Sequence, residues 1–208
     1  MKRSKSSREW LMRHVNDPYV QRSKKEGWRS RAAFKLLEID EKDRLLAPGA
    51  VVVDLGSAPG GWTQVAVKKA GARGRVVAID LLAMEPVAGA EFLQGDFTTD
   101  AGLAAVAAAL GGSQADVVLS DMAPNLSGIA ISDQARAMAL AELARDFALD
   151  HLKPGGVFLV KVFQGIGYDE FLKSLRAAFG KVVVRKPDAS RDESAEQYLL
   201  ARGPRDCG

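Results

Sequence analysis

Cysteine and histidine are scarce in this sequence of 208 residues, and their scarcity excludes several kinds of site. The single cysteine, Cys207, stands one residue from the end of the sequence. A disulfide framework, a cysteine-ligated metal and a cysteine nucleophile held in a core are therefore not expected. The two histidines, His14 and His151, have no metal-ligand spacing and no partner in the sequence, so we assign neither a role and predict no metal site.

Long apolar runs are also absent. No run approaches the roughly 18 residues that a membrane-spanning helix needs, and the alanine-rich segment at 103–110 is short enough to be a buried helix instead. The first residues are polar and charged, without the apolar region that a secretory signal carries. We therefore expect a cytoplasmic protein with no membrane contact.

What the sequence does have is size and an uneven distribution of charge. A hydrophobic content of 47% supports one substantial core, so we expect one domain. Residues 1–35 hold eleven Lys or Arg against three acids, a net charge of +8, whereas the whole chain carries +3 and the remainder therefore −5. A basic arm on an acidic body is the electrostatic footprint of a nucleic-acid-binding protein.

Aromatic residues support this interpretation of the arm, because Trp10, Tyr19 and Trp28 are interleaved with its charges and could stack on bases. A solvated, partly disordered tail is the simpler alternative. A transit peptide would also be rich in Arg and Ser, but the basic stretch continues without a break into the first expected helix. We place an RNA-binding arm at 1–30, with short helices around Trp10 and Tyr19, and a single domain at 31–208.

Strands and helices alternate along the rest of the chain. The expected strands cover 51–56, 75–81, 91–96, 115–121, 156–163, 181–186 and 196–202, and the expected helices cover 32–42, capped by Ser30, 62–70, 100–110, 133–151 and 168–179. Such alternation is typical of an α/β fold with a mostly parallel sheet and helices on both faces. The last two strands are close enough to pair as an antiparallel ribbon. No heptad or apolar patch indicates more than a monomer.

A glycine- and proline-rich turn, GSAPGGW at 56–62, joins the first strand to the next helix. A strand, tight turn and helix start of this kind bind a nucleotide-like ligand against exposed backbone N–H groups. The glycine spacing matches neither a dinucleotide fingerprint nor a Walker A loop, which disfavours a pyrophosphate or triphosphate ligand. Ionisable residues fall at or just after the strand ends, where parallel sheets bind their ligands: Asp54, Asp80, Asp96, Asp121 and Lys161.

Two of these acids suggest a nucleoside ligand. Asp80 is positioned to accept hydrogen bonds from ribose hydroxyls, and Asp96 could accept one from an adenine amino group. Each could instead simply cap the next helix or turn. The acids taken together favour the ligand-binding interpretation more than either does alone.

The motifs GSAPGGW, DLL, QGDF, SDMAPNLSG, VKVFQG and the early RSRAAFKL, in this order and spacing, closely resemble the FtsJ-type (RrmJ-type) ribosomal RNA methyltransferases. The resemblance covers almost the whole chain. It implies a Rossmann-like, S-adenosylmethionine-dependent methyltransferase fold, with a seven-stranded sheet whose last strand is reversed. It also implies methylation of a ribose 2′-hydroxyl, with a uridine in the ribosomal RNA of the large ribosomal subunit as the target.

The resemblance also implies roles for particular residues. By motif, the family's catalytic Lys–Asp–Lys–Glu set falls on Lys35, Asp121, Lys161 and Glu196. Its cofactor positions fall on Gly60, Trp62, Asp80, Asp96 and Asp121. Glu193 stands three residues before Glu196, in a loop rich in acids, and is the alternative for the last acid.

The chemistry of ribose methylation requires groups of the kind found in this Lys–Asp–Lys–Glu set. A ribose hydroxyl is a very weak acid, so its attack on a sulfonium methyl benefits from a general base. Lys161 lies in an apolar strand and can serve if desolvation and a second cation, Lys35, move its pKa toward neutrality. Asp121 would orient the lysine and face the sulfonium, and Glu196 would position Lys35 or the hydroxyl. More simply, Lys35 could pair with Glu38 on an exposed helix face.

Other functions remain open at this point. Ribose methylation of transfer RNA or another RNA is the main alternative, because similar catalytic sets serve it. A ribosome-assembly factor without catalysis is less well supported, since a pure binder has no use for a buried lysine at 161. Amino-group methylation lacks its Asn/Asp-Pro-Pro-aromatic motif, carbon-5 pyrimidine methylation lacks a well-placed cysteine, and the glycine spacing disfavours a dinucleotide oxidoreductase.

Overall fold

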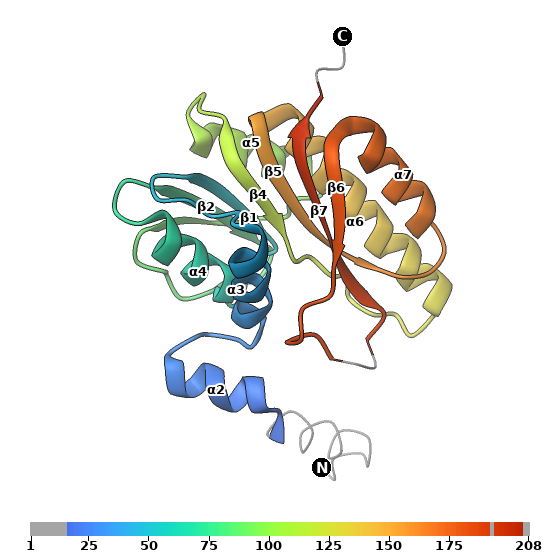
Figure 1. The fold of residues 1–208 in the computed structure, drawn as a ribbon, viewed down its shortest axis with the longest axis horizontal. Coiled ribbons are helices and arrows are strands. Elements are labelled where there is room, and N and C mark those ends of the chain that lie inside the picture. The colour runs from blue at the N-terminus through green and yellow to red at the C-terminus, as the bar shows by residue number, and fades with distance from the viewer. Residues whose placement is uncertain (1–15, 192–193, 206–208) are drawn as a thin grey trace.

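The computed structural model describes residues 16–191 and 194–205 and is built around one sheet. The strands are β1 (Val51–Leu55), β2 (Arg75–Asp80), β3 (Ala90–Gln94), β4 (Ala115–Ser120), β5 (Leu152–Phe163), β6 (Phe179–Arg185) and β7 (Glu196–Pro204). Their order is β3-β2-β1-β4-β5-β7-β6 (Figure 1). The pairs from β3 to β5 are parallel, whereas β7 runs antiparallel to both of its neighbours. The predicted α/β fold, with seven strands and a reversed last strand, is confirmed.

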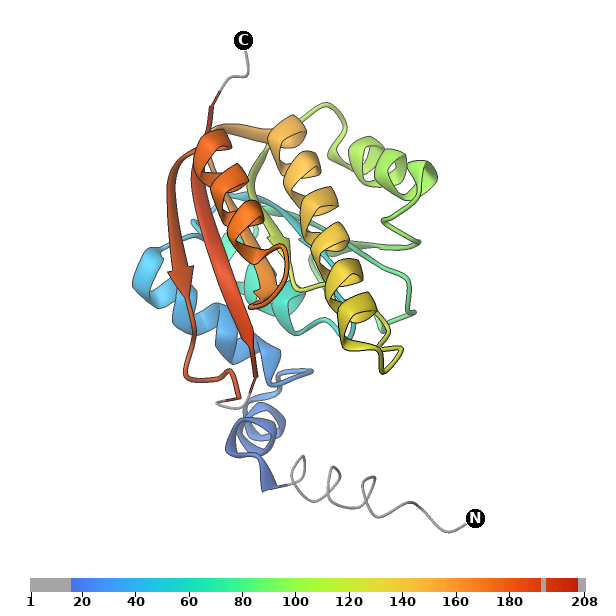
Figure 2. The ribbon, with the colours of Figure 1, turned by 90° about the vertical axis from the view of Figure 1, so that its right-hand side faces the viewer.

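Helices cover both faces of the sheet and enclose a core on each side. The helices are α2 (Pro18–Glu26), α3 (Ala32–Asp43), α4 (Gly61–Ala70), α5 (Asp100–Leu110), α6 (Ala130–His151) and α7 (Tyr168–Ala178). Alternate strand residues point to opposite faces, so Val53 packs in the core under α5, α6 and α7 while Val52 packs under α3 and α4. Figure 2 shows α6 and α7 lying side by side on one face.

The basic arm is described from residue 16 onward and contains α2. The Asp17 carboxylate caps this helix by accepting hydrogen bonds from the backbone N–H groups of Tyr19 and Val20, at 3.0 and 3.4 Å. Tyr19 packs on Phe34 of α3, with ring centroids 5.6 Å apart. The helix predicted around Tyr19 is therefore confirmed, whereas the one predicted around Trp10 lies outside the described residues. Both views place α2 at the end of the molecule to which β6 runs (Figures 1 and 2).

The predicted cap of α3 is wrong. Arg31 occupies the cap position, and the helix opens with a tight turn in which the N–H groups of Ala33 and Phe34 donate to the carbonyls of Ser30 and Arg31, at 3.3 and 3.1 Å. The hydroxyl of Ser30 is buried and has no hydrogen-bond partner among the described residues.

Two further helix predictions need correction. The alanine-rich helix α5 is buried on one face only, because Ala104, Ala105 and Ala108 are exposed. Helix α6 begins at Ala130, ahead of the predicted start at 133. Asp133 lies inside its first turn, where its carboxylate accepts hydrogen bonds from the N–H groups of Ser127 and Gly128 in the preceding loop.

None of the helices within the described ranges has the length and apolar content needed to cross a lipid bilayer.

Candidate active site

The carboxyl ends of the central strands bring the predicted ionisable residues to one edge of the sheet. Asp54 and Asp80 belong to the last residues of β1 and β2, and Asp121 follows β4 directly. Ser120 of β4 pairs with Val160 of β5, so Asp121 and Lys161 stand at the next position of the same register. The prediction that these side chains share an edge is confirmed.

The turn between β1 and α4 approaches the chain after β4 very closely. Gly56 has φ of 78°, and a Cβ atom there would lie 2.5 Å from Cγ of Met122, so the position requires glycine. The peptide bond between Ala58 and Pro59 is cis. Helix α4 then begins at Gly61. The N–H groups of its first turn have no carbonyl partner within the helix and can serve a ligand.

A cavity of about 440 Å³ lies between this turn and the segments that follow β2, β3 and β4. Three predicted cofactor residues line it, namely Asp80, Asp96 and Asp121. Apolar side chains also line it, among them Leu81, Leu82, Phe97, Met122, Pro124 and Leu140. The volume suits a nucleoside-sized ligand, and the lining suits one that has hydroxyl and amine donors, an apolar ring and a positive charge. Within residues 16–191 and 194–205, no group of three potential metal ligands converges.

Asp80 and Asp96 also hold the local backbone. Asp80 accepts hydrogen bonds from the N–H groups of Ala58 and Leu82, at 2.9 and 2.8 Å. Asp96 accepts from the N–H and the hydroxyl of Thr98, at 2.9 and 2.6 Å, and these bonds keep the pKa of the Asp96 carboxyl below its usual value. A carboxylate oxygen can accept more than one hydrogen bond, so a turn-capping role and a ligand-binding role are compatible here.

Gly60 and Trp62 are placed differently from the acids. The Trp62 side chain is 3% exposed, its indole N–H donates to the carbonyl of Ala32 at 2.8 Å, and its ring lies 5.6 Å from that of Tyr198. Gly60 has φ of 105°, and its N–H donates to the carbonyl of Ser57 at 2.7 Å. Neither Gly60 nor Trp62 lines the cavity, and Trp62 supports the site as a core residue.

Lys161 and Asp121 form one half of the predicted catalytic set. Lys161 Nζ donates to the backbone carbonyl of Asp121 at 2.7 Å and lies 3.2 Å from Asp121 Oδ1. The side chains of Lys161 and Asp121 are 8% and 18% exposed. This arrangement holds an amine, largely shielded from solvent, next to a carboxylate that lines the cavity, as a proton-transfer group requires.

Lys35 and Glu196 form the other half. Lys35 Nζ donates to Glu196 Oε1 at 2.5 Å, joining α3 to the start of β7, and the two side chains are 13% and 10% exposed. The alternative pairing of Lys35 with Glu38 is wrong, because Glu38 instead accepts a hydrogen bond from the backbone N–H of Ala189 at 3.2 Å. Glu193, the other candidate for the last acid, lies outside the described residues.

Tyr198 connects these two halves, and sequence reasoning did not single it out. The residue is completely buried, its hydroxyl donates to Asp121 Oδ1 at 2.9 Å, and Lys35 Nζ lies 5.7 Å from its ring centroid. Burial raises the pKa of the Tyr198 hydroxyl well above its usual value, and the charges of Asp121 and Glu196 add to this shift. Tyr198 is therefore a neutral donor. The available signal was strand alternation, which puts Glu196 and Tyr198 on the same face of β7.

Asp54 lies beneath the turn that follows β1 and is completely buried. Its Oδ2 accepts a hydrogen bond from the hydroxyl of Thr63 at 2.7 Å, whereas its Oδ1 has no partner among the described residues. Desolvation raises the pKa of the Asp54 carboxyl to about 7, with smaller contributions in the same direction from the charges of Asp121 and Asp80. Asp54 supports the floor of the site and does not line the cavity.

Comparisons with known sequences agree with this geometry. A sequence model of the FtsJ-like methyltransferases matches residues 28–204. The chain is 62% identical to a protein of Azoarcus sp. named ribosomal RNA large subunit methyltransferase E, over 96% of this chain and 98% of the relative. A protein of the same name from Marinobacter nauticus is 59% identical, over 98% of each chain.

Solved structures show the same fold. A Plasmodium falciparum protein, provisionally described as a ribosomal RNA methyltransferase, superposes with a TM-score of 0.74 at 27% identity, over 85% of this chain and 98% of that chain. A Streptococcus mutans protein, provisionally described as a methyltransferase and crystallised with S-adenosylhomocysteine, gives a TM-score of 0.52 at 12% identity, over 80% and 95% of the two chains. This second likeness concerns the fold alone.

Proposed function

The chain belongs to the FtsJ-like methyltransferase family, and on that premise we propose that it transfers a methyl group from S-adenosylmethionine to a ribose 2′-hydroxyl of large-subunit ribosomal RNA. The proposed acceptor is a uridine in the assembled large subunit, and the enzyme acts as a cytoplasmic monomer. The observation that carries the proposal is the buried contact between Lys161 and Asp121, a residue that also lines the cavity. The names of the curated relatives support the choice of RNA.

The residues around the cavity fit S-adenosylmethionine by their chemistry. When bound, this cofactor supplies a methyl group activated by a positively charged sulfonium. In the proposal, Asp80 accepts hydrogen bonds from the ribose hydroxyls and Asp96 accepts one from the adenine amino group. The N–H groups in the first turn of α4 bind the carboxylate of the methionine portion. Asp121 favours a positive charge in the cavity through its own negative charge.

Lys161 acts as the general base in this proposal. Its Nζ takes the proton of the ribose hydroxyl while the hydroxyl oxygen forms its bond to the methyl carbon and the carbon–sulfur bond breaks. The amine must be neutral to do so. Asp121 orients the amine through its carboxylate, 3.2 Å from Nζ, and its backbone carbonyl, 2.7 Å from Nζ.

The other half of the set positions the reacting groups. Glu196 holds Lys35 at 2.5 Å, and the Tyr198 hydroxyl holds the Asp121 carboxylate at 2.9 Å. We assign the ribose hydroxyl to the end of the cavity at Asp121, next to Lys161. The methyl donor is already activated, so holding the hydroxyl in line for attack supplies most of the rate acceleration.

Methyl transfer from labelled S-adenosylmethionine tests this function. We expect label in large ribosomal subunits purified from a strain that lacks the enzyme, mapped to one ribose 2′-oxygen of a uridine. Total transfer RNA and capped RNA are assayed in parallel. Label in one of these RNAs but not in ribosomal RNA would preserve the reaction and overturn the proposed substrate. No label in any RNA, with cofactor binding intact, would overturn the proposed activity.

Replacing Lys161 by methionine tests the base. Methionine retains much of the apolar stem and removes the amine, so we expect methyl transfer to fall by about 10² to 10⁴-fold, while cofactor binding measured by calorimetry is retained. Lys153→Met is the matched control, because Lys153 lies at the opposite end of β5, is 42% exposed and pairs with Asp116. The control should keep wild-type turnover. A Lys161→Met enzyme with wild-type turnover would remove the base assignment.

A further inference from the structure

Asp17, at the start of α2, has two roles that use different oxygens. Oδ1 caps α2, whereas Oδ2 pairs with Nη1 of Arg31 and lies 3.9 Å from Nε of Arg191. The Asp17 and Arg31 side chains are only 10% and 15% exposed. The arm is therefore attached to the methyltransferase domain by a largely buried ion pair, and removing one partner of such a pair is strongly destabilising.

Arg31 extends this attachment to the β6–β7 loop, defined here as the described residues 186–191 and 194–195. Its Nη2 donates to the backbone carbonyl of Ala189. Ala189 is completely buried, and its N–H donates to the Glu38 carboxylate of α3 at 3.2 Å. One planar guanidinium thus bridges the arm and the β6–β7 loop with its two terminal nitrogens, which the single ammonium of a lysine reproduces poorly.

The next residue of the β6–β7 loop reaches the catalytic set. Ser190 is 4% exposed, and its hydroxyl donates to Glu196 Oε1 at 3.0 Å. Lys35 Nζ contacts the same oxygen at 2.5 Å. Contacts therefore lead from Asp17 through Arg31 and the two neighbouring loop residues to the Lys35–Glu196 pair.

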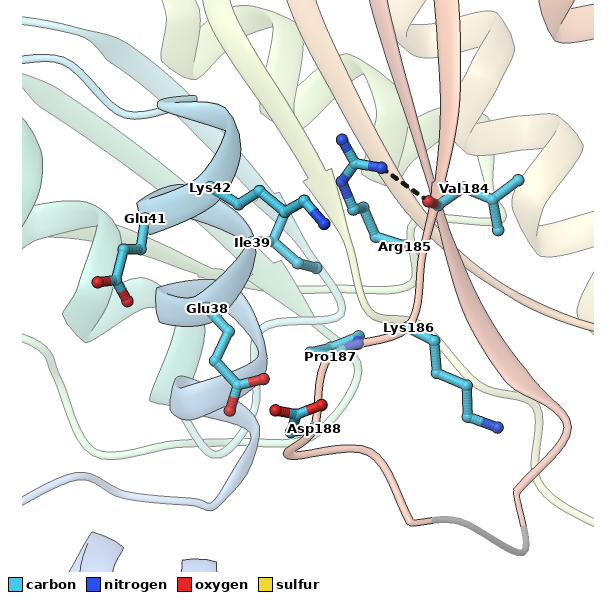
Figure 3. A pocket seen from close by; sticks show the side chains of 9 residues that line it. All are labelled: Glu38, Ile39, Glu41, Lys42, Val184, Arg185, Lys186, Pro187 and Asp188. Atoms are coloured by element: carbon cyan, nitrogen blue, oxygen red, sulfur yellow. Dashed lines mark hydrogen bonds between the residues drawn. The ribbon is translucent and has the colours of Figure 1, made fainter.

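Helix α3, which carries Lys35, is held firmly at its other end. Arg185 of β6 binds both carboxylate oxygens of Asp43 at 2.7 Å, at the C-terminal end of α3. Figure 3 shows Pro187 and Asp188 of the β6–β7 loop beside Glu38 of α3, at a cavity of about 390 Å³. At the Lys35 end of α3, the arm and the loop add contacts through Arg31 and Glu38 to the core packing of this helix.

We infer that the arm does more than attract RNA: through Arg31 and Ser190 it sets the position of the Lys35–Glu196 pair, so turnover depends on a docked α2. Arg31 and Ser190 are positioning residues, because they act on the reacting groups through Glu196. RNA bound to α2 in its docked position would meet a complete catalytic set. The inference rests on the proposed function for its activity measurement.

Asp17→Asn separates docking from helix capping. Asparagine is as good an N-cap as aspartate, so α2 is retained while the charge that pairs with Arg31 is lost. We expect kcat at saturating RNA to fall by about tenfold, because a small displacement of catalytic groups is costly. Glu26→Gln is the matched control. It removes a carboxylate from the same helix, where Glu26 is 39% exposed and pairs with Arg22, and it should leave kcat unchanged.

Ser190→Ala tests the last link alone. This variant should lower kcat while the amides of α2 exchange hydrogen at the wild-type rate. In Asp17→Asn and in Arg31→Lys, by contrast, the amides of Ala189 and Ser190 should exchange faster than in wild type and in Glu26→Gln. Hydrogen exchange requires no substrate, so it distinguishes failure of this inference from failure of the proposed function.

Two results would overturn the inference. Wild-type kcat in Asp17→Asn, with a change confined to KM for RNA, would show that the arm binds RNA but does not position the catalytic residues. Unchanged exchange at Ala189 and Ser190 in both Asp17→Asn and Arg31→Lys would show that the arm does not hold the β6–β7 loop.

Discussion

Asp54 is a carboxyl group whose burial makes the stability of the fold depend on pH. Its ordinary pKa is 3.8, and desolvation raises it to about 7 in the folded chain. Between these values the folded protein retains a proton that the unfolded chain has released. The free energy of unfolding therefore falls as pH rises through this window, by up to about 4 kcal/mol for a shift of this size.

Asp54→Asn should abolish this contribution. Asparagine carries no ionisable group and can still accept the hydrogen bond of Thr63, so the urea midpoint should vary less between pH 5 and pH 8 than it does in wild type. Glu142→Gln, at an exposed position on α6, should follow the wild-type pH dependence. Equal pH dependence in wild type and Asp54→Asn would mean that Asp54 is not protonated near neutrality in the fold.

Single residues of the site differ in how far the sequence alone reveals them. Asp80, Asp96 and Asp121 stand at or just after strand ends, so the topology brings them together without further information. Lys35 and Glu196 stand 161 residues apart, and no local pattern reports that α3 faces the start of β7; the family resemblance alone pointed to both. The hydroxyl of Tyr198 was missed because a tyrosine in an apolar strand resembles an ordinary core residue.

At the scale of elements, Arg29 holds together two loops next to the cavity that Asp80, Asp96 and Asp121 line. Its guanidinium donates to the carbonyls of Pro59 at 3.3 Å, Pro86 at 2.7 Å and Glu85. Its backbone N–H donates to the side chain of Gln64 in α4 at 2.8 Å. One side chain between α2 and α3 therefore holds both the turn after β1 and the segment between β2 and β3.

Arg29→Ala should weaken cofactor binding, because hydrogen bonds that involve a charged donor position these two loops. We expect about tenfold weaker binding of S-adenosylmethionine in calorimetry. Arg73→Ala, in the exposed turn after α4, is the control and should bind as wild type does. Wild-type affinity in Arg29→Ala would show that the cavity keeps its shape without the hydrogen bonds of Arg29.

Most elements were predictable because burial imposes a pattern on them. Strands covered on both faces require continuous apolar runs, and β1, β2 and β4 show such runs. Errors occur at the starts of elements: β5 begins at Leu152, ahead of the expected 156, and the cap of α3 and the start of α6 also differ from the prediction. At the start of α3, the neighbouring helix is the cause. Ser30 Oγ would lie 2.4 Å from a Cβ atom at Gly61, so this hydroxyl is turned toward α4 rather than toward the N–H groups of α3. No pattern within the segment itself reports that contact.

At the scale of the whole molecule, the basic arm and the carboxyl ends of the parallel strands lie at the same end. The first 35 residues carry a net charge of +8. Helix α2 lies at the end of the molecule where β6 ends, and the parallel strands direct their carboxyl ends to the same end (Figures 1 and 2). In the proposed function, an RNA attracted by the arm would therefore be guided toward the edge that holds Asp121 and Lys161. Long-range attraction of this kind is screened by salt.

Removing residues 2–15 should reduce the electrostatic part of RNA binding and leave Asp17 in place. The deletion removes five of the eleven basic residues of the first 35. Each lost phosphate contact makes the slope of log affinity against log salt shallower by about 0.7 to 0.9, so five lost contacts change it by at most about 4.5. KM for RNA, measured from 50 to about 200 mM salt, should rise most at low salt.

A Lys173→Ala, Arg176→Ala double variant, which removes two exposed charges from α7, should keep the wild-type slope. A truncated enzyme with the wild-type slope would show that the five basic residues among 2–15 make no phosphate contacts. The attraction of RNA would then depend on Lys24 and Lys25 in the last turn of α2.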